Sequence, residues 1–521
     1  MKQNRGSGIS TRHGLTRRSV LSAGLAITGV LARAPLSKAD EPKRGGVLKL
    51  GLAGASTTNN MDPSLMQDPV SANQSQQVHS CLIDIDANTE LVPGLAESWN
   101  ANGALDTWQF NLRKGIEFHN GKTLVPDDVI YSLERHIAKD SKSAAKALLG
   151  GIKRISADGP SGIKIELSGA DANFPYVLGD YHLGIVQKDF TDWSKPIGTG
   201  PFSMKTYEPG VRSYSERNKN YFRDREPYVD AVEVIAINDW TARLNALKSG
   251  EVDIINRVDN RTAGPLTSSS DVKIVASPGR THYCFVMDTR VAPFSDPNVR
   301  LALKHAIDRD AILKTVLAGF GSIGNDHSVP RSDPMYAELP QHTYDPEKAK
   351  DYLKKAGLSN LKLDLSAADG AFAGSIDMAL LLQQSAKAAR IEINVIREPD
   401  DGYWDNVWMK KAFYMSWFGG RPTADLMLTL AYKSDSSWND TFWKSEEFDN
   451  LLVKARATAD VAARKALYAK MQSMIWETGG YLIPVFGNSI DAHGARVGGF
   501  LPNPNNELMN LYAARQVWLE T

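Results

Sequence analysis

The chain has 521 residues, which is too long for one ordinary hydrophobic core and predicts at least two domains. Its 60 basic and 60 acidic residues cancel, but residues 1–39 hold seven of the bases and no acid, so the rest of the chain carries a balance of minus seven. Because binding to a phosphate backbone needs a basic face, we expect no nucleic-acid partner.

Residues 1–39 have the order of an export signal: a basic lead, an apolar run over 20–31 and small residues before the body begins. The apolar run is too short to span a bilayer as a helix. The stretch 16–21 (TRRSVL) is similar to the twin-arginine form of such a signal, with the general secretion route as the alternative. The cleavage pattern fits SKA at 37–39 better than ARA at 32–34, which a proline follows. A disordered basic tail or an uncleaved anchor is the remaining alternative.

The cysteine content bears on the compartment. No cysteine lies in or just after the leader, so a lipid anchor of the bacterial lipoprotein kind is not expected. We therefore expect a soluble, monomeric protein of the periplasm. Cys81 and Cys284 are the only cysteines in the sequence. An oxidising compartment permits a disulfide between them, but we predict two separate buried thiols.

The body of the chain begins with a predicted strand at 45–53, where leucines alternate with polar or small residues. A polar loop at 54–63 follows, because its glycine, serine, threonine and asparagine residues cannot continue either periodic element. Residues 66–82 are predicted to form a helix.

A strand, a turn and a helix are predicted in succession over 91–135. Trp108, Phe110 and Leu112 alternate with polar residues, as in a half-buried strand whose successive side chains point to opposite faces. Pro126 then opens a helix, since its missing N–H would be unpaired there, and two acids follow at the positive end of the helix dipole. These elements carry no chemistry of their own.

The order of short motifs in this stretch is more specific than its periodicity. PGLAESW, an aromatic strand ending in LRKGI, then FHNG and DDV closely resemble the family 5 extracellular solute-binding proteins of ABC importers, the peptide, opine and nickel class. Further similar blocks are GTGPF at 198–202, AIDR at 306–309 and YDPEKA at 344–349. A phosphate-binding loop is the rival interpretation of GTGPF, but no Lys-Ser or Lys-Thr follows it. The resemblance covers residues 45–521.

The later elements continue as an α/β pattern. A strand, a helix and a strand over 232–255, with Gly250 at the left-handed helix stop, form a unit typical of parallel sheets. The other predicted elements are a strand at 283–287, a helix starting near 297, strands at 361–365 and 391–395 on either side of a helix at 375–389, a helix over 467–475 and a strand at 481–486.

The resemblance implies an α/β, two-lobed periplasmic binding protein of the Venus-flytrap kind, with a discontinuous first lobe and an extra side subdomain. The expected first lobe combines 40–60, 198–279 and 488–521, the side subdomain is 61–197, and the second lobe is 280–487. Two crossing strands would act as hinges, and a solute that touches both lobes would stabilise their closed arrangement. The expected partners are the solute and the permease and ATPase of an ABC importer.

The expected pocket stretch is 412–425, where an apolar strand runs into a glycine turn. The resemblance makes Trp417, Gly419, Gly420 and Arg421 ligand candidates; Trp417 offers a flat face for stacking, although core packing also explains it. In peptide binders of the family the residue after Trp-x-Gly is an acid that holds the ligand amine, and here that residue is Gly420. Arg421 would suit a carboxylate or phosphate.

Three further candidates lie in loops. Ser56 and Thr57 follow the first strand, where the family's loop faces the cleft, although a turn of small polar residues needs no ligand to explain it. Dipeptide binders place an arginine for the ligand carboxylate just past the strand that 361–365 resembles, but here that loop reads SAADG, so both ionic anchors of dipeptide recognition are absent or altered. Asp369 in this loop suits a cation or sugar hydroxyls. Solvated loop charges are the alternative for Asp369 and Arg421.

Catalytic and metal motifs are missing from the sequence. It holds neither HExxH nor GxSxG, and its histidines are scattered without metal spacing, so we expect no enzyme, no cofactor and no metal site. Nickel or haem delivery would require a histidine or aromatic-arginine cluster. The expected ligand is a small peptide or peptide-like solute, with opines, sugar conjugates and oligosaccharides as alternatives. A sensor-coupled binding protein and a hydrolase are alternatives of other classes.

Overall fold

The computed structural model describes residues 41–520 except for 67, 144, 147 and 400–402. The predicted export signal at 1–39, with its twin-arginine motif and cleavage sites, lies outside the described residues. Residues 42–521 form one compact unit. Among the helices that the structure describes, none combines the length and apolar character needed to cross a membrane.

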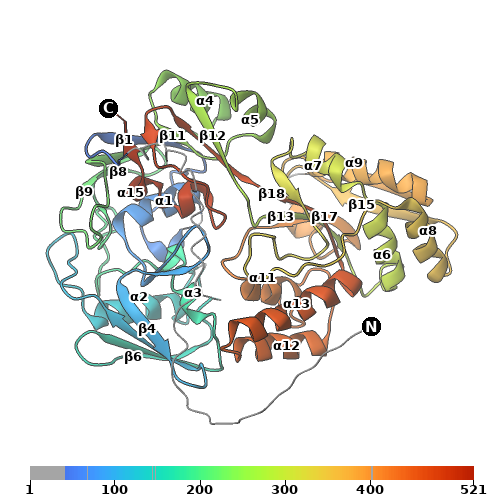
Figure 1. Ribbon diagram of the computed structural model, residues 1–521, viewed down its shortest axis with the longest axis horizontal. Helices are drawn as coiled ribbons and strands as arrows, with labels where there is room; N and C mark the ends of the chain where they lie inside the picture. The colour runs from blue at the N-terminus through green and yellow to red at the C-terminus, as the bar shows by residue number, and fades with distance from the viewer. Residues whose placement is uncertain (1–40, 67, 144, 147, 400–402, 521) are drawn as a thin grey trace, which may run out of the picture. The chain divides into compact units, whose positions relative to one another are not determined.

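A mixed seven-stranded sheet forms the centre of what we call the first lobe (Figure 1). β1 pairs in parallel with β10 and β11, and the other pairs in this sheet are antiparallel. Leu48, Leu50 and Leu52 of β1 are fully buried, as the alternation in the sequence predicts. In order across the sheet the strands are β12 (Val272–Ser277), β19 (Ser489–Gly494), β11 (Ile254–Ile255), β1 (Val47–Leu52), β10 (Ala231–Ala236), β9 (Arg212–Arg217) and β8 (Phe202–Glu208).

Helices and short strands cover the two faces of this sheet. On one face pack α1 (Pro69–Val78) and the C-terminal segment, and on the other α4 (Trp240–Ser249) and α5 (Asn260–Leu266). Gly250 ends α4 with a φ of 75°, a conformation that costs glycine little. The C-terminal segment holds β20 (Val497–Gly498), α14 (Glu507–Asn510), α15 (Ala513–Gln516) and β21 (Trp518–Leu519).

A four-stranded antiparallel sheet forms a side subdomain with its own apolar core around Phe110 and Leu133. Its order is β4 (Ala96–Ala101), β5 (Thr107–Leu112), β7 (Gly162–Leu167) and β6 (Ile152–Ala157). α2 (Pro126–Ile137) contacts β6 and β7. The remaining elements of this region are η1 (Pro63–Leu65), β2 (Ile83–Ile85), β3 (Leu91–Pro93), α3 (Phe174–Val177) and η2 (Tyr181–Leu183).

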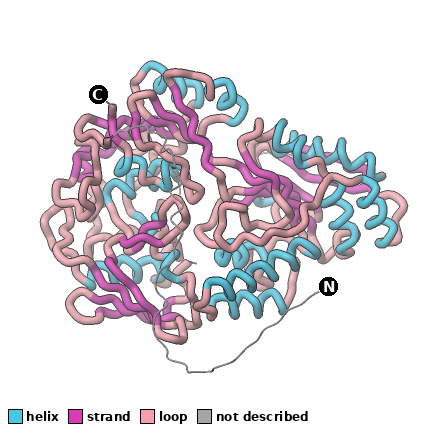
Figure 2. The backbone as a smooth tube through the Cα atoms, in the orientation of Figure 1, coloured by secondary structure: helices cyan, strands magenta, loops and turns pink. Residues whose placement is uncertain are grey.

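A six-stranded sheet forms the centre of the second lobe, with helices on both faces (Figure 2). Its order is β14 (Gly321–Ile323), β18 (Tyr481–Gly487), β13 (His282–Met287), β17 (Phe413–Phe418), β15 (Leu361–Ala367) and β16 (Ile391–Arg397). One face packs against α6 (Pro297–Ala306), α7 (Arg309–Thr315), α8 (Pro346–Lys355), α9 (Ser375–Ala386) and η3 (Lys387–Ala389). The other packs against α10 (Tyr403–Asn406), α11 (Ala424–Tyr432), α12 (Glu446–Arg456) and α13 (Val461–Thr478).

The chain passes between the two large sheets twice, and the two passages are bonded to each other. Ser277 of β12 pairs with Ser489 of β19, and His282 of β13 pairs with Phe486 of β18. Between these pairs the Gly487 N–H donates to the Thr281 carbonyl at 2.9 Å. A Cβ on Gly279 would lie 2.0 Å from the Gly487 carbonyl oxygen, so the close approach requires glycine.

Side-chain caps account for many helix starts. An aspartate carboxylate accepts a hydrogen bond from a first-turn N–H and so satisfies a donor that the helix leaves unpaired. The capping residues are Asp68 of α1, Asp239 of α4, Asp259 of α5, Asp296 of α6, Asp308 of α7, Asp345 of α8 and Asp460 of α13.

Three local predictions need correction. The helix predicted over 66–82 is the shorter α1, which ends at Val78 because His79 is extended. β4 (Ala96–Ala101) is a strand that the sequence pattern did not predict, and β5 provides it with a ladder of partners. α13 begins at Val461, before the predicted start at 467. Cys81 and Cys284 are both buried and free, which confirms the prediction of separate thiols.

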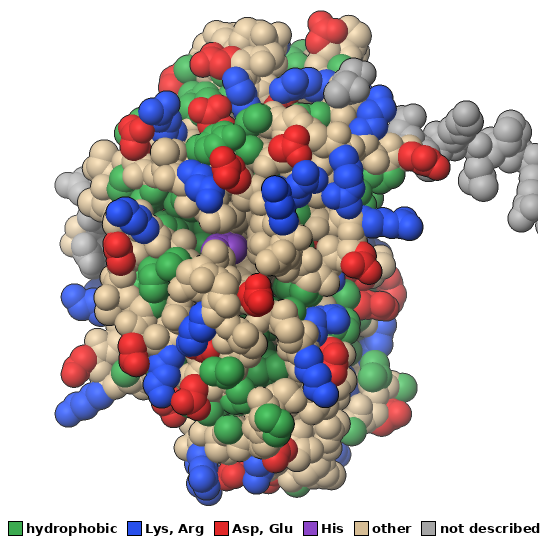
Figure 3. Space-filling view, turned by 90° about the vertical axis from the view of Figure 1, so that its left-hand side faces the viewer, with side chains coloured by type: hydrophobic (Ala, Val, Ile, Leu, Met, Phe, Trp, Pro, Cys, Tyr) green, Lys and Arg blue, Asp and Glu red, His purple; other side chains and the backbone are tan. Residues whose placement is uncertain are grey.

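The surface mixes charges of both signs. On the face shown in Figure 3, lysine and arginine side chains are interspersed with aspartate and glutamate side chains and with small apolar areas. Many of these charges form surface pairs such as Lys362 with Glu392, which contribute little to stability because water screens them.

Candidate functional site

A cavity of about 90 Å³ lies where the side subdomain, the second lobe and the C-terminal segment meet. A volume of this kind holds several water molecules, at about 10–15 Å³ for each, so a larger solute requires the surrounding segments to move apart. The lining residues are Gln76, Ile85, Gly179, Asp180, Tyr181, Gly420, Pro422, Asn505, Asn506, Asn510 and Tyr512.

The end of β17 supplies one wall of this site. Trp417 is 41% exposed, whereas the strand residues on either side of it are buried. A Cβ on Gly420 would lie 2.6 Å from the Arg280 Cβ, so glycine is needed where the two segments pass. Arg421 bends back over this turn, and its Nη1 donates to the carbonyls of Gly419 and Gly420, both at 3.1 Å. The turn therefore presents a cation beside an exposed aromatic ring.

Arg421 is an arginine with no close counter-ion. Among the described residues, no carboxylate lies within ion-pair distance, 4.0 Å, of its guanidinium. Burial lowers the pKa of Arg421, and the nearby Asp180 and Tyr181 oppose that effect. The charge of Arg421 is therefore balanced by Asp180 only at longer range.

Asp180 faces the cavity from the side subdomain. Its Oδ1 accepts from the His182 N–H at 3.0 Å and pairs with His182 Nδ1 at 2.6 Å. Burial alone would raise the pKa of Asp180, but the hydrogen bonds and charge of His182 outweigh it and lower the pKa. Asp180 therefore stays ionised, and among the described residues none donates to its Oδ2.

The C-terminal wall of the cavity is a backbone turn in the left-handed conformation, which L-residues other than glycine rarely adopt. Residues 508–511 have φ values of 54°, 60°, 60° and 66°. The left-handed conformation costs about 1–2 kcal/mol for each residue other than glycine. Strong contacts hold the turn: the Leu508 N–H donates to Asp491 Oδ2 at 2.7 Å, and Glu507 accepts from Asn256 and Arg257, both at 3.2 Å. Such strain concentrates at functional sites.

Arg280 links the lobes next to the crossing segments. Its Nη1 pairs with Asp333 of the second lobe at 2.5 Å, and its Nη2 donates to the Thr89 hydroxyl of the first lobe at 3.1 Å. Thr89 in turn donates to Asn505 Oδ1 at 3.2 Å. One buried guanidinium therefore joins both lobes and the C-terminal wall.

A second link between the lobes lies at the far edge of the side subdomain. The Ala172 N–H donates to the Arg456 carbonyl at 2.8 Å, and Asn173 Nδ2 donates to the Tyr468 hydroxyl at 3.0 Å. Tyr468 donates to Asp425 at 3.0 Å, and Asp425 pairs with the Arg456 guanidinium at 2.9 Å. We call this group the interlobe latch. It holds the lobes together away from the crossing segments.

The latch predicts an effect on local opening. Asn173→Ala removes one neutral hydrogen bond between the lobes and leaves the Tyr468–Asp425 bond intact, at a cost of about 1 kcal/mol. The Ala172 amide is therefore expected to exchange with deuterium about fivefold faster in the variant, as measured by hydrogen exchange with mass spectrometry. Asn220→Ala, an exposed asparagine elsewhere in the first lobe, is the matched control. Equal exchange in the two variants would show that the latch does not hold the lobes.

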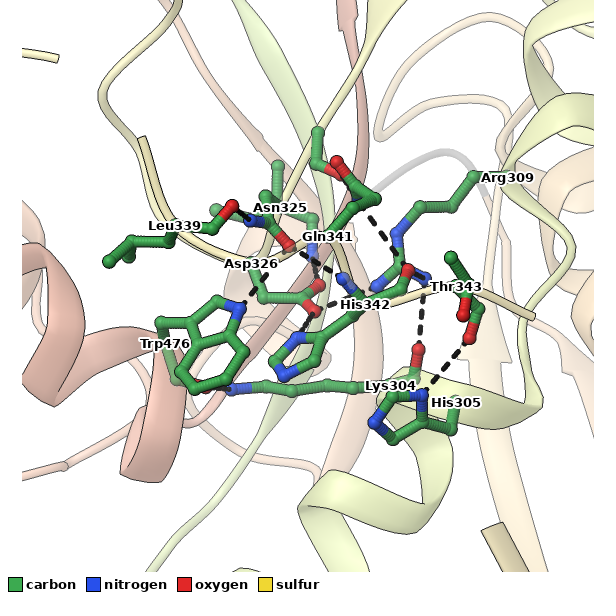
Figure 4. Close-up of polar contacts among 12 residues, drawn as sticks. Lys304, His305, Arg309, Asn325, Asp326, Leu339, Gln341, His342, Thr343 and Trp476 are labelled. Carbon is green, nitrogen blue, oxygen red and sulfur yellow. Dashed lines mark hydrogen bonds and ion pairs between the residues drawn. The ribbon is translucent and has the colours of Figure 1, made fainter. Parts of the chain in front are cut away.

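A buried ionic cluster occupies the second lobe (Figure 4). Asp326 Oδ2 lies 2.7 Å from both Arg309 Nη2 and His342 Nδ1, and Asp326 Oδ1 accepts from the Ile483 N–H at 2.9 Å. Lys304 is fully buried, and its Nζ donates to the Trp476 carbonyl at 3.0 Å. Arg309, Asp326 and His342 bond to one another, and Lys304 bonds to backbone carbonyls of 475 and 476, so the cluster organises the lobe.

The structure groups four of the seven candidates at the end of β17, namely Trp417, Gly419, Gly420 and Arg421, and of these Gly420 lines the cavity. Asp369 lies apart, where its Oδ1 accepts from the Gly374 N–H at 3.2 Å at the start of α9. Ser56 and Thr57 also lie apart from the cavity lining, against the turn at Gly210, where a Cβ would be 2.6 Å from the Ser56 carbonyl carbon. The ligand roles of all seven stay predictions.

Sequence analysis missed most of the cavity lining. Asp180, Tyr181, Asn506, Asn510 and Tyr512 lie in loops and short turns with no periodic pattern. Only the run of asparagines near the C-terminus could have drawn attention to that wall. In the part of the chain that the structure describes, no three histidine, cysteine, aspartate or glutamate side chains are grouped so as to hold a metal ion.

Comparison with known proteins places the chain among solute-binding proteins. The sequence model for bacterial extracellular solute-binding proteins, family 5 Middle, matches residues 90–440. The oligopeptide-binding protein AppA of Bacillus subtilis is 25% identical over 509 residues, covering 91% of this chain and 92% of that protein.

Two solved structures share the fold. The ABC transporter-associated periplasmic binding protein DppA of Helicobacter pylori, in complex with the peptide STSA, has a TM-score of 0.74 and 25% identity and covers 92% of this chain and 99% of that one. HbpA2 of Haemophilus parasuis has a TM-score of 0.83 and 22% identity, and the match covers 91% of this chain and 100% of that one. At this identity the match supports the fold alone. The predicted two-lobed α/β fold is confirmed, and the chain belongs to the family 5 bacterial extracellular solute-binding proteins.

Proposed function

We propose that this protein is the periplasmic solute-binding component of an ABC importer and that it carries small peptides or peptide-like solutes. The observation that carries this proposal is the cavity shared by the side subdomain, the end of β17 and the C-terminal turn. Its walls come from both lobes, so a solute in the cavity contacts both. Peptide-binding relatives of similar length support the ligand class.

Binding would work by shifting a conformational equilibrium. A solute that contacts both lobes favours the closed arrangement by the difference between its contacts in the closed and open states. Arg280 and the interlobe latch influence the equilibrium between the open and closed arrangements before a solute binds, because they bond the lobes together without one. The permease would recognise the closed form, and no bond in the solute would be made or broken.

A thermal-shift screen tests the proposal. A solute that binds only the folded protein at 100 times its Kd stabilises it by about 2.7 kcal/mol, which raises the melting temperature measurably. We expect short peptides to raise it and opines and oligosaccharides to leave it unchanged. If an oligosaccharide alone stabilised the protein, the ligand class would be sugars and not peptides. Turnover of a bound peptide into products would contradict the transport role.

Trp417 provides a more specific prediction. Its exposed ring at the end of β17 offers a stacking surface, so Trp417→Ala is expected to weaken binding of a stabilising peptide about tenfold while leaving the unliganded melting temperature unchanged. Isothermal titration calorimetry measures the change. Trp438→Ala is the matched control, because Trp438 is 45% exposed in the same lobe but its ring contacts Trp408 and it is not part of the strand end that carries the lining residue Gly420. Equal affinities for the two variants would show that Trp417 does not contribute to ligand binding.

A further inference from the structure

A carboxylate without an ion-pair partner lies at the edge of the interlobe latch. Asp171 is half-buried and immediately precedes Ala172, whose N–H donates to the Arg456 carbonyl across the interface at 2.8 Å. Asp171 Oδ1 accepts from the Asn173 N–H at 2.8 Å, so a local turn holds the carboxylate beside the bond between the lobes. In the part of the chain that the structure describes, no basic side chain forms an ion pair with Asp171.

The second lobe brings a like charge toward this carboxylate. The charged groups that face Asp171 from the second lobe are Asp425 of α11, Arg456 of α12 and Arg464 of α13. Asp425 is buried and pairs with the Arg456 guanidinium at 2.9 Å, and it also accepts from the Tyr468 hydroxyl at 3.0 Å. Arg464 Nη1 donates to two backbone carbonyls just before α13, at 2.9 and 3.4 Å. Two carboxylates therefore meet across the interface, and both arginines are already bonded elsewhere.

Contact between the lobes makes the ionised form of Asp171 costly. Burial raises the pKa of Asp171 to about 6, and the charge of Asp425 adds to the rise. The Asn173 N–H and the two arginines lower the pKa without cancelling the rise. When the side subdomain and the second lobe separate, water returns to the carboxylate and its pKa moves back toward the ordinary value of 3.8. The joined arrangement therefore binds a proton that the separated arrangement releases between about pH 4 and pH 6.

We propose that Asp171 operates the interlobe latch as a proton switch, in which uptake of one proton from the solvent favours the contact between the side subdomain and the second lobe. By linkage, lowering the pH from 7 to 5 makes this contact about ninefold more favourable. The lobes are therefore held together more firmly in an acidified medium, and a solute between them is held more firmly as well. The inference goes beyond the proposed function, and its test needs no solute.

Hydrogen exchange with mass spectrometry of the solute-free protein measures the switch. The protection factor of the Ala172 amide, the ratio of its intrinsic to its measured exchange rate, reports how seldom the latch opens. For the wild type we expect this protection factor to rise about ninefold from pH 7 to pH 5. Over the same range, protection of the amides of β5 in the core of the side subdomain is expected to fall, because acid lowers the stability of the whole fold. Opposite changes at the two places distinguish the switch from a general effect of acid.

Neutral variants assign the proton to Asp171. Asp171→Asn keeps the shape of the side chain but cannot take up the proton. Its Ala172 protection factor is expected to exceed that of the wild type at pH 7 and to change less than twofold between pH 7 and pH 5. Asp171→Ser keeps an acceptor for the Asn173 N–H and is the second neutral variant, with the same expectation. Asp364→Asn removes an exposed carboxylate of β15 and is the matched control, which should keep the ninefold rise.

Two results would overturn the inference. The first is an Ala172 protection factor that stays constant or falls when the wild type is acidified, and this result does not depend on any variant. The second is a ninefold rise that persists in Asp171→Asn or Asp171→Ser, because another group would then take up the proton. Neither result bears on the transport role, which the thermal-shift screen tests separately.

Discussion

Lowering the pH from 7 to 5 is expected to remove about 5 kcal/mol from the free energy of unfolding. Burial lowers the pKa of His79 and His282 to about 3 and that of His136 and His327 to about 4. In the unfolded chain the same groups titrate near 6.5, so unfolding takes up protons below that pH. Stability is therefore fully present above pH 6.5 and falls as the pH drops. Each of the four histidines contributes a loss of about 2 kcal/mol at pH 5.

Two buried carboxylates act in the opposite direction. Burial raises the pKa of Asp171 and of Asp440 to about 6. A raised aspartate pKa means that the folded state binds the proton first, so these groups add stability as the pH falls from 6 toward 4. Each adds about 1.4 kcal/mol at pH 5, which offsets less than half of the loss from the histidines. Lowering the pH therefore decreases the free energy of unfolding, because the loss from the histidines exceeds the gain from the two aspartates.

Urea unfolding at pH values from 7 to 4.5 measures this loss. His282 provides a variant for assignment, because its ring lies 5.5 Å from that of Phe418 and 5.3 Å from that of Phe486, and neither ring nitrogen has a hydrogen-bond partner among the residues that the structure describes. His282→Phe keeps the aromatic packing and should reduce the slope of stability against pH by one proton, about 1.4 kcal/mol per pH unit. A slope equal to that of the wild type would show that His282 does not contribute to the acid sensitivity.

Asp326→Asn is expected to destabilise the protein by about 3–5 kcal/mol, because it leaves Arg309 and Lys304 buried without their shared counter-ion. Burial alone would raise the pKa of Asp326, but Arg309, His342 and Lys304 outweigh it and hold the pKa far below its ordinary value. The carboxylate therefore stays ionised well below the pH at which an ordinary aspartate takes up a proton. Its removal turns a compensated cluster into a set of isolated cations.

The measurement is urea unfolding at pH 7.5, where the four buried histidines with lowered pKa values are neutral. Asp364→Asn is the matched control, because the Asp364 carboxylate accepts from Asn394 at 2.8 Å on an exposed part of β15. Exposed polar substitutions of this kind usually change stability by less than about 0.5 kcal/mol. Similar losses in the two variants would mean that the buried cluster is not a major source of stability.

Local signals in the sequence predict local structure well. Pro126 and the acids after it predicted the start of α2, and Gly250 predicted the end of α4, because capping and backbone preferences act within a few residues. Alternation predicted β1 and β5 for the same reason. The family motifs extended these local predictions to the two-lobed fold, which periodicity alone could not supply.

The site depends on contacts between distant segments, and the sequence predicted less of it. Trp417 to Arg421 could be named as candidates because they lie at the end of a strand with a family motif, and their ligand roles stay predictions. Asp180 and Asn510 were missed because their importance arises only when three separate segments meet at the cavity. The left-handed turn at 508–511 was unpredictable for another reason: ordinary residues avoid that conformation, and bonds to distant residues, such as Leu508 N–H to Asp491 and Asn256 to Glu507, help to hold it.

The paired passages between the sheets make the second lobe an insertion with adjoining ends. Because Thr281 and Gly487 are hydrogen-bonded, everything between them leaves and re-enters the first lobe at one point. A chain in which a short turn replaced residues 282–486 would convert β12 and β19 into an ordinary hairpin, and the seven-stranded sheet would keep every strand. Such closely spaced ends are what domain grafting requires. The second lobe is therefore exchangeable. The corresponding lobes of relatives that bind other solutes can be grafted in at this junction.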